Sequence, residues 1–383
     1  MGTYIRCEPF EVATGWTYGL LPDVPMPPEV VAPRQALDDV LRPALESGPC
    51  FVTFSGGRDS SAVLAAATDL ARREGHAEPI PVTRVYPDIP ETDEADWQRT
   101  VVDHLRLTNW VRLNFRAGES DLLGDAAKAG LRRRGLLWPP ALHAHDVVFQ
   151  EVGPGSLITG EGGDAVLGMQ RVTPLVLFRR RRSLRRVLLP HAVGAVMPGP
   201  GRRMAATRAA RNSVQSRWLR PAALARHARL AAADATVEPL RFDRAKWMIT
   251  RRRSFATIRH NHAEAAREFG LVASDPLLDP RFVAAIAQWA GRWGFDGRTA
   301  AMHALFSDIL PEPVLTRSTK AAFNHAHAGD ETRRFASTWD GSGVDTDLVD
   351  PERLRQVWLS AEPTMAAGLL LQSAWLAHQE ANQ

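Results

Sequence analysis

The chain has 383 residues, 45% of them hydrophobic and 23% charged, and its formal net charge at pH 7 is +4. This length and composition are typical of a globular protein with one large or two ordinary domains and an ample core. Only two cysteines are present, Cys7 and Cys50, which excludes a disulfide framework and a four-cysteine zinc site.

The basic residues are almost all arginine, because lysine occurs only as Lys128, Lys246 and Lys320. The densest basic run, 178–186, has the pattern of a nucleic-acid or acidic-peptide site. In an arginine-rich chain we interpret it as a solvated helix or loop, so we expect no nucleic-acid partner. No signal-peptide pattern begins the chain and no apolar run reaches the length of a membrane span. We therefore expect a cytoplasmic protein without a membrane partner.

Residues 1–48 are rich in proline and end in a short amphipathic segment, Ala36–Leu45, so we interpret them as an N-terminal extension. Residues 49–170 then alternate between apolar runs typical of strands and segments with helical periodicity. The predicted strands are Cys50–Phe54, Ile80–Val85, Trp110–Phe115 and Ser156–Thr159, and the predicted helices are Ser60–Glu74, Thr92–Leu105, Glu119–Arg134 and Ala141–Val152. This alternation predicts an α/β core, a parallel sheet with helices on both faces and ligands at the carboxyl ends of its strands.

After Gly168 we expect no further strand. Residues from about 171 to 330 are rich in alanine, arginine and leucine with helical spacing, and we interpret residues 171–383 as a helical C-terminal lobe. A polar loop at Asp340–Asp347 and a final apolar helix around Ala366–His378 complete this lobe.

The most informative stretch follows the first predicted strand. It is a Ser-Gly-Gly-x-Asp-Ser loop that leads directly into a helix, and its residues are Ser55, Gly56, Gly57, Asp59 and Ser60. Two glycines let the backbone turn tightly and approach a ligand, while the hydroxyls and the first helical amides favour an anion. A carboxylate beside an anion site is best explained by a divalent cation that bridges it to phosphates. The loop therefore predicts a pyrophosphate site for ATP.

A second glycine-rich, acidic turn follows the fourth predicted strand and contains Gly160, Glu161 and Asp164. In a parallel sheet this turn faces the same edge as the first loop, so Asp59 and Asp164 are placed to share Mg²⁺. Either motif alone is compatible with an ordinary turn, since Gly-Gly-Asp is common loop chemistry. Both motifs together, each directly after a strand, favour a functional site.

This pair of motifs resembles the synthetase domain of asparagine synthetases and their relatives, which include β-lactam synthetases and lasso peptide cyclases. Two further segments agree: residues 275–282 resemble the family's Pro-Phe-Leu-Asp turn, and residues 310–323 resemble its Leu-Pro…Arg-x-x-Lys-x-x-Phe stretch. The resemblance runs from about residue 50 to 330. It implies an ATP pyrophosphatase fold, similar to the adenine nucleotide alpha hydrolases, that activates a carboxylate.

The resemblance also implies ATP and Mg²⁺ as cofactors, with the metal between Asp59 and Asp164. Positive charge from Arg317 or Lys320 would stabilise the pyrophosphate as it leaves. Glu94 and its acidic neighbours resemble the family's Asp-Glu pair, although acids are also frequent at a helix N-terminus. The residues implied to bind the nucleotide are Ser55, Gly56, Gly57, Asp59, Ser60, Val82, Val85, Gly160 and Glu161.

The chain departs from the family pattern at three places. It lacks the glutaminase domain of asparagine synthetases, so we expect no glutamine hydrolysis. Where the family has a lysine before the Leu-Pro turn this chain has Arg298, so either Arg298 substitutes or Lys320 supplies the catalytic charge; an arginine can hold pyrophosphate but is a poor base. The family's Glu and Tyr after the second turn are here Ala165 and Gln170. Divergence on the acceptor side predicts a substrate other than aspartate.

The leading hypothesis is an ATP-dependent carbon–nitrogen ligase that adenylates a substrate carboxylate, releases pyrophosphate and lets an amine displace AMP. We expect a small-molecule or peptide substrate, as in macrolactam or specialised-metabolite biosynthesis, and a separate protein that completes the site stays an open alternative. An amidotransferase subunit that receives ammonia from another chain is the second hypothesis. Alternatives of other classes are a tRNA-modifying enzyme, disfavoured by the lack of paired catalytic cysteines, and a non-catalytic scaffold.

Overall fold

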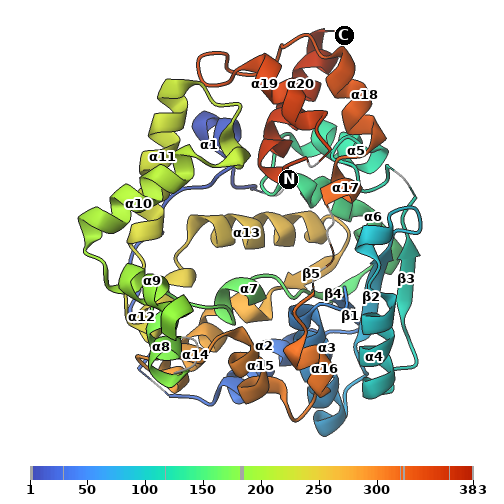
Figure 1. The fold of residues 1–383 in the computed structure, drawn as a ribbon. Helices are drawn as coiled ribbons and strands as arrows, with labels where there is room; N and C mark the ends of the chain where they lie inside the picture. Colours follow the sequence, from blue (N-terminus) through green and yellow to red (C-terminus); the bar gives the residue numbers. More distant parts are fainter. Residues whose placement is uncertain are drawn as a thin grey trace.

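The computed structural model describes residues 3–28, 30–116, 118–181, 185–319, 321, 324–361 and 363–381. A five-stranded parallel sheet organises the fold, with the strand order β3-β2-β1-β4-β5 (Figure 1). Its strands are β1 (Cys50–Thr53), β2 (Ile80–Val85), β3 (Val111–Asn114), β4 (Gly155–Ile158) and β5 (Leu271–Ser274). The α/β fold class predicted from the sequence is confirmed.

The connections of the sheet reverse direction at its centre. The chain proceeds from β1 to β2 and β3 on one side, and then crosses back to place β4 and β5 on the other side. Phe51 of β1 is accordingly paired with Ile80 on one side and with Leu157 on the other. Such a reversal leaves a crevice at the carboxyl ends of the two central strands, where ligands of open α/β sheets bind. The loops after β1 and β4 therefore begin at the switch point.

The absence of strands after Gly168 is a prediction that the structure contradicts. β5 lies far along the chain, and it extends the sheet by pairing in parallel with β4, Gly155 opposite Leu271 and Ile158 opposite Ser274. It is only four residues long, and Val272 in it is 68% exposed, so neither alternation nor a long apolar run marked it. β5 also lies between α13 and a 3-10 helix that begins at Pro276, so the sequence around it has a helical pattern.

Helices surround the sheet and form the rest of the molecule. In the first half of the chain they are α1 (Pro9–Thr14), α2 (Pro33–Glu46), α3 (Arg58–Glu74), α4 (Ala95–Leu105), α5 (Asp125–Arg134), the 3-10 helix η2 (Pro140–His145), α6 (Asp146–Val152), α7 (Gly163–Val166) and α8 (Thr173–Arg180). In the second half they are α9 (Arg185–Val196), α10 (Gly199–Arg211), α11 (Pro221–Thr236), α12 (Phe242–Ile249), α13 (Arg253–Arg267), α14 (Pro280–Ala290), α15 (Arg298–Phe306), α16 (Glu312–Thr316), α17 (Asn324–His327), α18 (Asp330–Thr338), α19 (Pro351–Trp358) and α20 (Gly368–Ala381).

The two faces of the sheet pack into different clusters, because successive strand residues point to opposite sides. Val52 belongs to the largest cluster, which α2, α3, α4, α12 and α14 complete. Phe51 belongs to a second cluster on the other face, with contributions from η2, α6 and α13. The amphipathic segment of the N-terminal extension forms α2, whose Leu37 and Leu41 are fully buried in the first of these clusters.

A third cluster lies away from the sheet and joins the two ends of the chain. It contains Phe10 of α1 together with Trp358 of α19, Trp375 of α20 and Trp339, which directly follows α18. Figure 1 shows α13 running between these C-terminal helices and the helices beside the sheet. The layer of α18–α20 therefore covers the side of the molecule on which the strands end.

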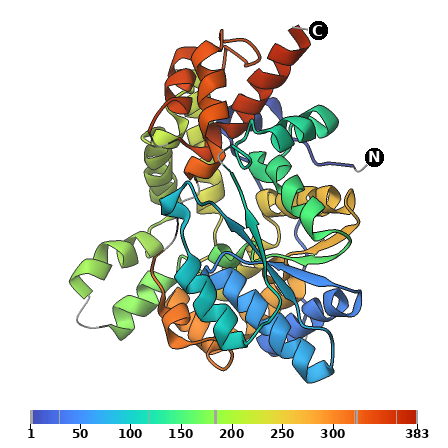
Figure 2. The ribbon, with the colours of Figure 1, turned by 90° about the vertical axis from the view of Figure 1, so that its right-hand side faces the viewer.

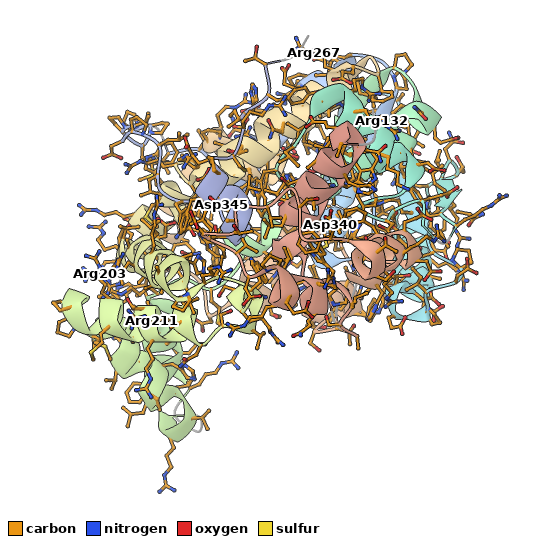
Figure 3. The ribbon with its side chains drawn as sticks, turned by 90° about the horizontal axis from the view of Figure 1, so that it is seen from above. Arg132, Arg203, Arg211, Arg267, Asp340 and Asp345 are labelled. Carbon is orange, nitrogen blue, oxygen red and sulfur yellow. The ribbon has the colours of Figure 1, made fainter. Side chains whose placement is uncertain are left out.

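α8 and α9 project from the body of the molecule (Figure 2). The predicted basic run falls partly on α8 and α9, although Arg182 to Leu184 lie outside the described residues. Arg203 and Arg211 of α10 lie on the same side of the molecule as this projection (Figure 3). Among the helices that the structure describes, none is both long and apolar enough to cross a membrane.

Candidate active site

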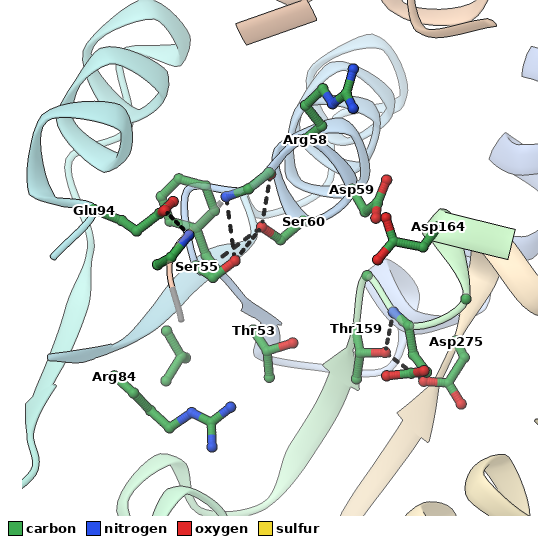
Figure 4. Close-up of a pocket in the computed structure, with 18 of the residues that line it drawn as sticks. Thr53, Ser55, Arg58, Asp59, Ser60, Arg84, Glu94, Thr159, Asp164 and Asp275 are labelled. Carbon is green, nitrogen blue, oxygen red and sulfur yellow. Dashed lines mark hydrogen bonds between the residues drawn. The ribbon is translucent and has the colours of Figure 1, made fainter. Parts of the chain in front are cut away.

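The loop after β1, which we call the phosphate loop (residues 55–60), is closed by its own hydroxyl groups. Ser60 Oγ donates to the carbonyl of Gly57 at 3.1 Å and accepts from the amide of Ser55 at 3.3 Å, and Ser55 Oγ accepts from the amide of Gly57 at 3.3 Å (Figure 4). Gly56 has a φ of +83°, a conformation that favours glycine. α3 begins directly after the turn, at Arg58, so its free amides and the loop hydroxyls converge on one site.

The loop after β4 packs so closely on the phosphate loop that only glycine fits. A Cβ added to Gly160 would lie 2.8 Å from the amide nitrogen of Ser60, and one added to Gly163 would lie 2.2 Å from Cγ of Asp59. Thr159 fixes the start of this loop, because its hydroxyl donates to Asp275 at 2.5 Å and accepts from the amide of Glu161 at 3.0 Å. The two sequence motifs therefore form one site, as the parallel sheet predicted.

Asp59 and Asp164 both pair with Arg298. The guanidinium of Arg298 donates to Oδ1 of Asp59 at 2.6 Å and also pairs with Asp164. Arg298 is the first residue of α15 and follows Gly297, whose φ is +98°. Two carboxylates from different loops thus face one position beside the phosphate loop.

These carboxylates suit Mg²⁺ when phosphates supply the remaining ligands. Mg²⁺ in nucleotide sites is typically held by one or two carboxylates together with phosphate oxygens and water. Within the described ranges no group of three or more His, Cys, Asp or Glu side chains forms a metal site of its own. Asp59 and Asp164 would therefore hold the metal together with ATP rather than alone.

A buried ion pair fixes the other side of the phosphate loop. Arg317 pairs with Glu94, and the two side chains are only 4% and 5% exposed. Nη1 of Arg317 donates to the carbonyl of Gly56 at 2.8 Å, and its guanidinium lies 4.7 Å from the ring centre of Trp97. Glu94 also accepts from the amide of Ala321 at 2.9 Å and makes no capping hydrogen bond. Glu94 thus holds Arg317 in place. Neither interpretation of the acidic segment, as the family's Asp-Glu pair or as acids at a helix N-terminus, included this role.

The two loops open into a cavity of about 620 Å³. Most of the predicted site residues line it: Ser55, Gly57, Asp59, Ser60, Val82, Gly160, Glu161, Asp164, Arg298 and Arg317. Two predicted residues do not: Val85 pairs with Asn114 in the sheet, and Gly56 is covered by its bond to Arg317. Lys320 lies outside the described residues.

The carboxylates of the cavity influence one another. Glu161 is exposed to the cavity, and the partial desolvation there raises its pKa; the charges of Asp275, Asp164 and Asp59 raise the pKa further. A raised pKa makes the carboxylate of Glu161 a stronger base than the carboxylate of an ordinary glutamate.

Lys246 of α12 is a site residue that sequence reasoning did not assign. Its side chain is fully buried, and Nζ donates to the carbonyls of Ala165 at 2.8 Å and Gly168 at 3.0 Å. These carbonyls lie at the C-terminal end of the short helix α7, which carries Asp164, so the hydrogen bonds from Lys246 hold that helix in place. Burial lowers the pKa of Lys246 to about 7. The only signal for Lys246 in the sequence was the scarcity of lysine in the chain.

The sheet topology and the two loops at its switch point define a nucleotide-binding protein with an ATP pyrophosphatase-like fold. The sequence matches the family described as asparagine synthase over residues 33–377. The chain therefore belongs to the asparagine synthetase family, whose members are ATP-dependent ligases. The comparison with curated proteins gave no match.

Proposed function

We propose that this protein is an ATP-dependent, AMP-forming carbon–nitrogen ligase. It activates a substrate carboxylate as an acyl-adenylate, and an amine then displaces AMP to form an amide. The observation that carries this proposal is the convergence of Asp59 and Asp164 beside the phosphate loop, because two acids there serve to bind the metal of a nucleotide.

The phosphate loop would hold the pyrophosphate part of ATP. Its amides and the hydroxyls of Ser55 and Ser60 face the N-terminal end of α3, where the helix dipole favours negative charge. Mg²⁺ bound by Asp59 and Asp164 would neutralise phosphate charge. Val82 lines the same cavity from β2 and would contact the base.

In the first step an oxygen of the substrate carboxylate attacks the α-phosphorus, and the bond from that phosphorus to the bridging oxygen of pyrophosphate breaks. The leaving pyrophosphate gains charge, which nearby cations stabilise. Arg298 would be one such cation, since it pairs with both acids beside the phosphate loop. Arg317 uses its nitrogens on Gly56, Glu94 and Thr319, so it acts by positioning the phosphate loop.

In the second step the amine nitrogen attacks the acyl carbon, the bond to AMP breaks, and the nitrogen loses a proton. Glu161 faces the cavity with a raised pKa, so it is suited to accept that proton. The amine belongs either to the same substrate, which gives a macrolactam, or to a second molecule. The open alternative of ammonia delivered by another chain uses the same site.

ATP–pyrophosphate exchange with labelled pyrophosphate, Mg²⁺ and pooled acids and peptides tests this proposal. We expect exchange that depends on one acid and is lost in Asp164→Asn, while Asp96→Asn, at an exposed position of α4, retains it. Ammonium and a panel of amines, added to the active pool, then identify the acceptor. ATP binding without exchange for any acid would contradict the adenylation chemistry. Release of ADP instead of AMP during amide formation would contradict it as well.

A further inference from the structure

The part of the chain that contains α9 and α10 carries positive charge alone. Residues 165–233 include fifteen arginines and no aspartate or glutamate, so all 43 acids of the chain lie elsewhere in the sequence. A region with a single sign of charge attracts partners of the opposite sign. We call the described residues 186–211, which form most of α9 and all of α10, the basic surface.

The arginines on the outer side of α10 are not used by the fold. Arg203, Arg208 and Arg211 are exposed, and within the described residues their side chains make no ion pair or hydrogen bond. Arg99 of α4 shows the contrast, because it pairs with Asp96 of the same helix. Figure 3 shows Arg203 and Arg211 on the side of the molecule where α8 and α9 project. Three guanidinium groups on one helix therefore remain available to an external anion.

Apolar side chains are exposed among these arginines. On α9, Leu189, Val193 and Val196 follow one another at helical spacing on one face, and each is at least half exposed. On α10, Met204 is 74% exposed, and Arg208 lies one helical turn further along the same face. Exposed apolar side chains gathered in one region are typical of a contact surface for another macromolecule.

This combination favours a polypeptide partner over other anionic partners. Single strands of nucleic acid are typically bound by aromatic side chains that stack on the bases, and the exposed large hydrophobic residues of the basic surface include no aromatic one. A helix that lies in a membrane surface separates its cations from its apolar face, whereas Met204 shares its face with Arg208 and Arg211. Carboxylates of a peptide would pair with the guanidinium groups, and apolar residues between them would contact the exposed apolar side chains.

The basic surface is connected to the candidate active site through α8, on which α9 packs. Gln170, which precedes α8, donates to a carbonyl of α7 at 3.2 Å, and α7 carries Asp164. Arg180 at the end of α8 pairs with Asp296 at 2.6 Å, two residues before Arg298. A peptide segment bound to the basic surface would therefore lie against helices that are joined to the metal-binding acids.

We propose that the basic surface binds an acidic segment of a peptide substrate, in which aspartate or glutamate is interspersed with apolar residues. The inference rests on the proposed function, because it identifies the substrate of the ligase as a peptide. The segment that binds α9 and α10 is separate from the carboxylate and the amine that react beside the phosphate loop. Recognition and chemistry thus take place on different parts of the same substrate.

Fluorescence anisotropy with labelled model peptides tests the inference on the full-length protein. The acidic probe is a peptide of repeated Glu-Glu-Leu-Ala units, and in two matched probes glutamine replaces every glutamate or serine replaces every leucine. We expect the acidic probe to bind about tenfold or more tightly than the glutamine probe and several-fold more tightly than the serine probe. Its affinity should fall as salt is added, because the guanidinium groups are exposed.

Two triple variants locate the binding site. Arg203→Glu, Arg208→Glu and Arg211→Glu together should weaken binding of the acidic probe by about tenfold or more. The matched control reverses the charge of three exposed arginines on other helices, so that both variants have the same net charge, and it should retain most of the affinity: Arg99→Glu, Arg334→Glu and Arg353→Glu. Both variants should bind a non-hydrolysable ATP analogue within about twofold of the wild type, which shows that they are folded.

Several results would overturn the inference. Equal binding of the acidic probe and either matched probe would do so, as would equal losses of affinity in the two triple variants. Binding of a single-stranded oligonucleotide or of phosphatidylglycerol vesicles through the three arginines of α10, without binding of the acidic probe, would replace the peptide by another partner. Probe binding that depends on these arginines in a protein without pyrophosphate exchange would uphold the basic surface and contradict only the adenylation chemistry.

Discussion

The ion pair between Arg317 and Glu94 predicts a large and specific loss of stability when one partner is removed. Glu94→Gln keeps the size of the side chain but leaves the guanidinium buried beside Trp97 without its counter-charge. The loss of one partner of a buried pair typically costs about 3–5 kcal/mol. We expect a cost in this range, because both side chains are almost fully buried and, within the described residues, the further hydrogen bond of Glu94 comes from the amide of Ala321.

A double-mutant cycle tests the coupling between the two side chains. The free energy of unfolding is measured by urea denaturation for the wild type, Glu94→Gln, Arg317→Met and the double variant, with tryptophan fluorescence as the probe. We expect the double variant to be more stable than the sum of the single losses predicts, by about 2–3 kcal/mol, since the second substitution removes the orphaned charge. Asp96→Asn is the control, because Asp96 is 96% exposed and its pair with Arg99 should contribute at most about 0.5 kcal/mol.

Two results would refute this reasoning. A cost below about 1 kcal/mol for Glu94→Gln would mean that water reaches the pair and replaces the carboxylate. Strict additivity in the cycle would mean that the two side chains act independently. In either case Arg317 would not position the phosphate loop through Glu94.

Lys246→Met should abolish a pH dependence of the stability that the wild type shows. Burial lowers the pKa of Lys246 in the folded state to about 7, so between about pH 7 and pH 10 the unfolded chain binds more protons than the folded one. The free energy of unfolding of the wild type should therefore rise by about 3 kcal/mol relative to the variant from pH 7 to pH 9.5, as denaturation experiments would measure. Gly163→Ala should weaken the binding of Mg²⁺–ATP by about tenfold or more in calorimetry, because the added Cβ would displace Asp59. Gly194→Ala is the control: Gly194 lies in α9 with open space around it, so this variant should retain its affinity for Mg²⁺–ATP and gain about 0.5–1 kcal/mol of stability. Asp59→Asn and Asp164→Asn should each reduce the binding of Mn²⁺ to the ATP complex, as measured by electron paramagnetic resonance; Mn²⁺ affinity equal to wild type in both would remove these residues from the metal site.

The sequence alone was sufficient to predict the four strands before Gly168. β2 has the predicted bounds, and β1 ends one residue earlier than predicted, because apolar runs bounded by glycine-rich turns are strong local signals. β5 was missed for the opposite reason: it is a short edge strand within a helical stretch, and its place in the sheet depends on pairing with β4. Local patterns carry no information about such a pairing.

The same distinction between local motifs and long-range contacts applies to the site. The two loops are contiguous motifs, so Asp59 and Asp164 were assigned from spacing and from the direction of parallel strands. Glu94 and Arg317 are 223 positions apart, and nothing local indicates that they pair.

The most direct test of the central claim is isotope transfer from the substrate carboxylate. An acid that supports pyrophosphate exchange is labelled with ¹⁸O in its carboxylate and incubated with the enzyme, ATP, Mg²⁺ and the amine acceptor. If the carboxylate attacks the α-phosphorus, one ¹⁸O atom appears in AMP, as mass spectrometry of the nucleotide would show. Appearance of ¹⁸O in inorganic phosphate together with ADP would contradict the account, because the γ-phosphorus would then be the site of attack.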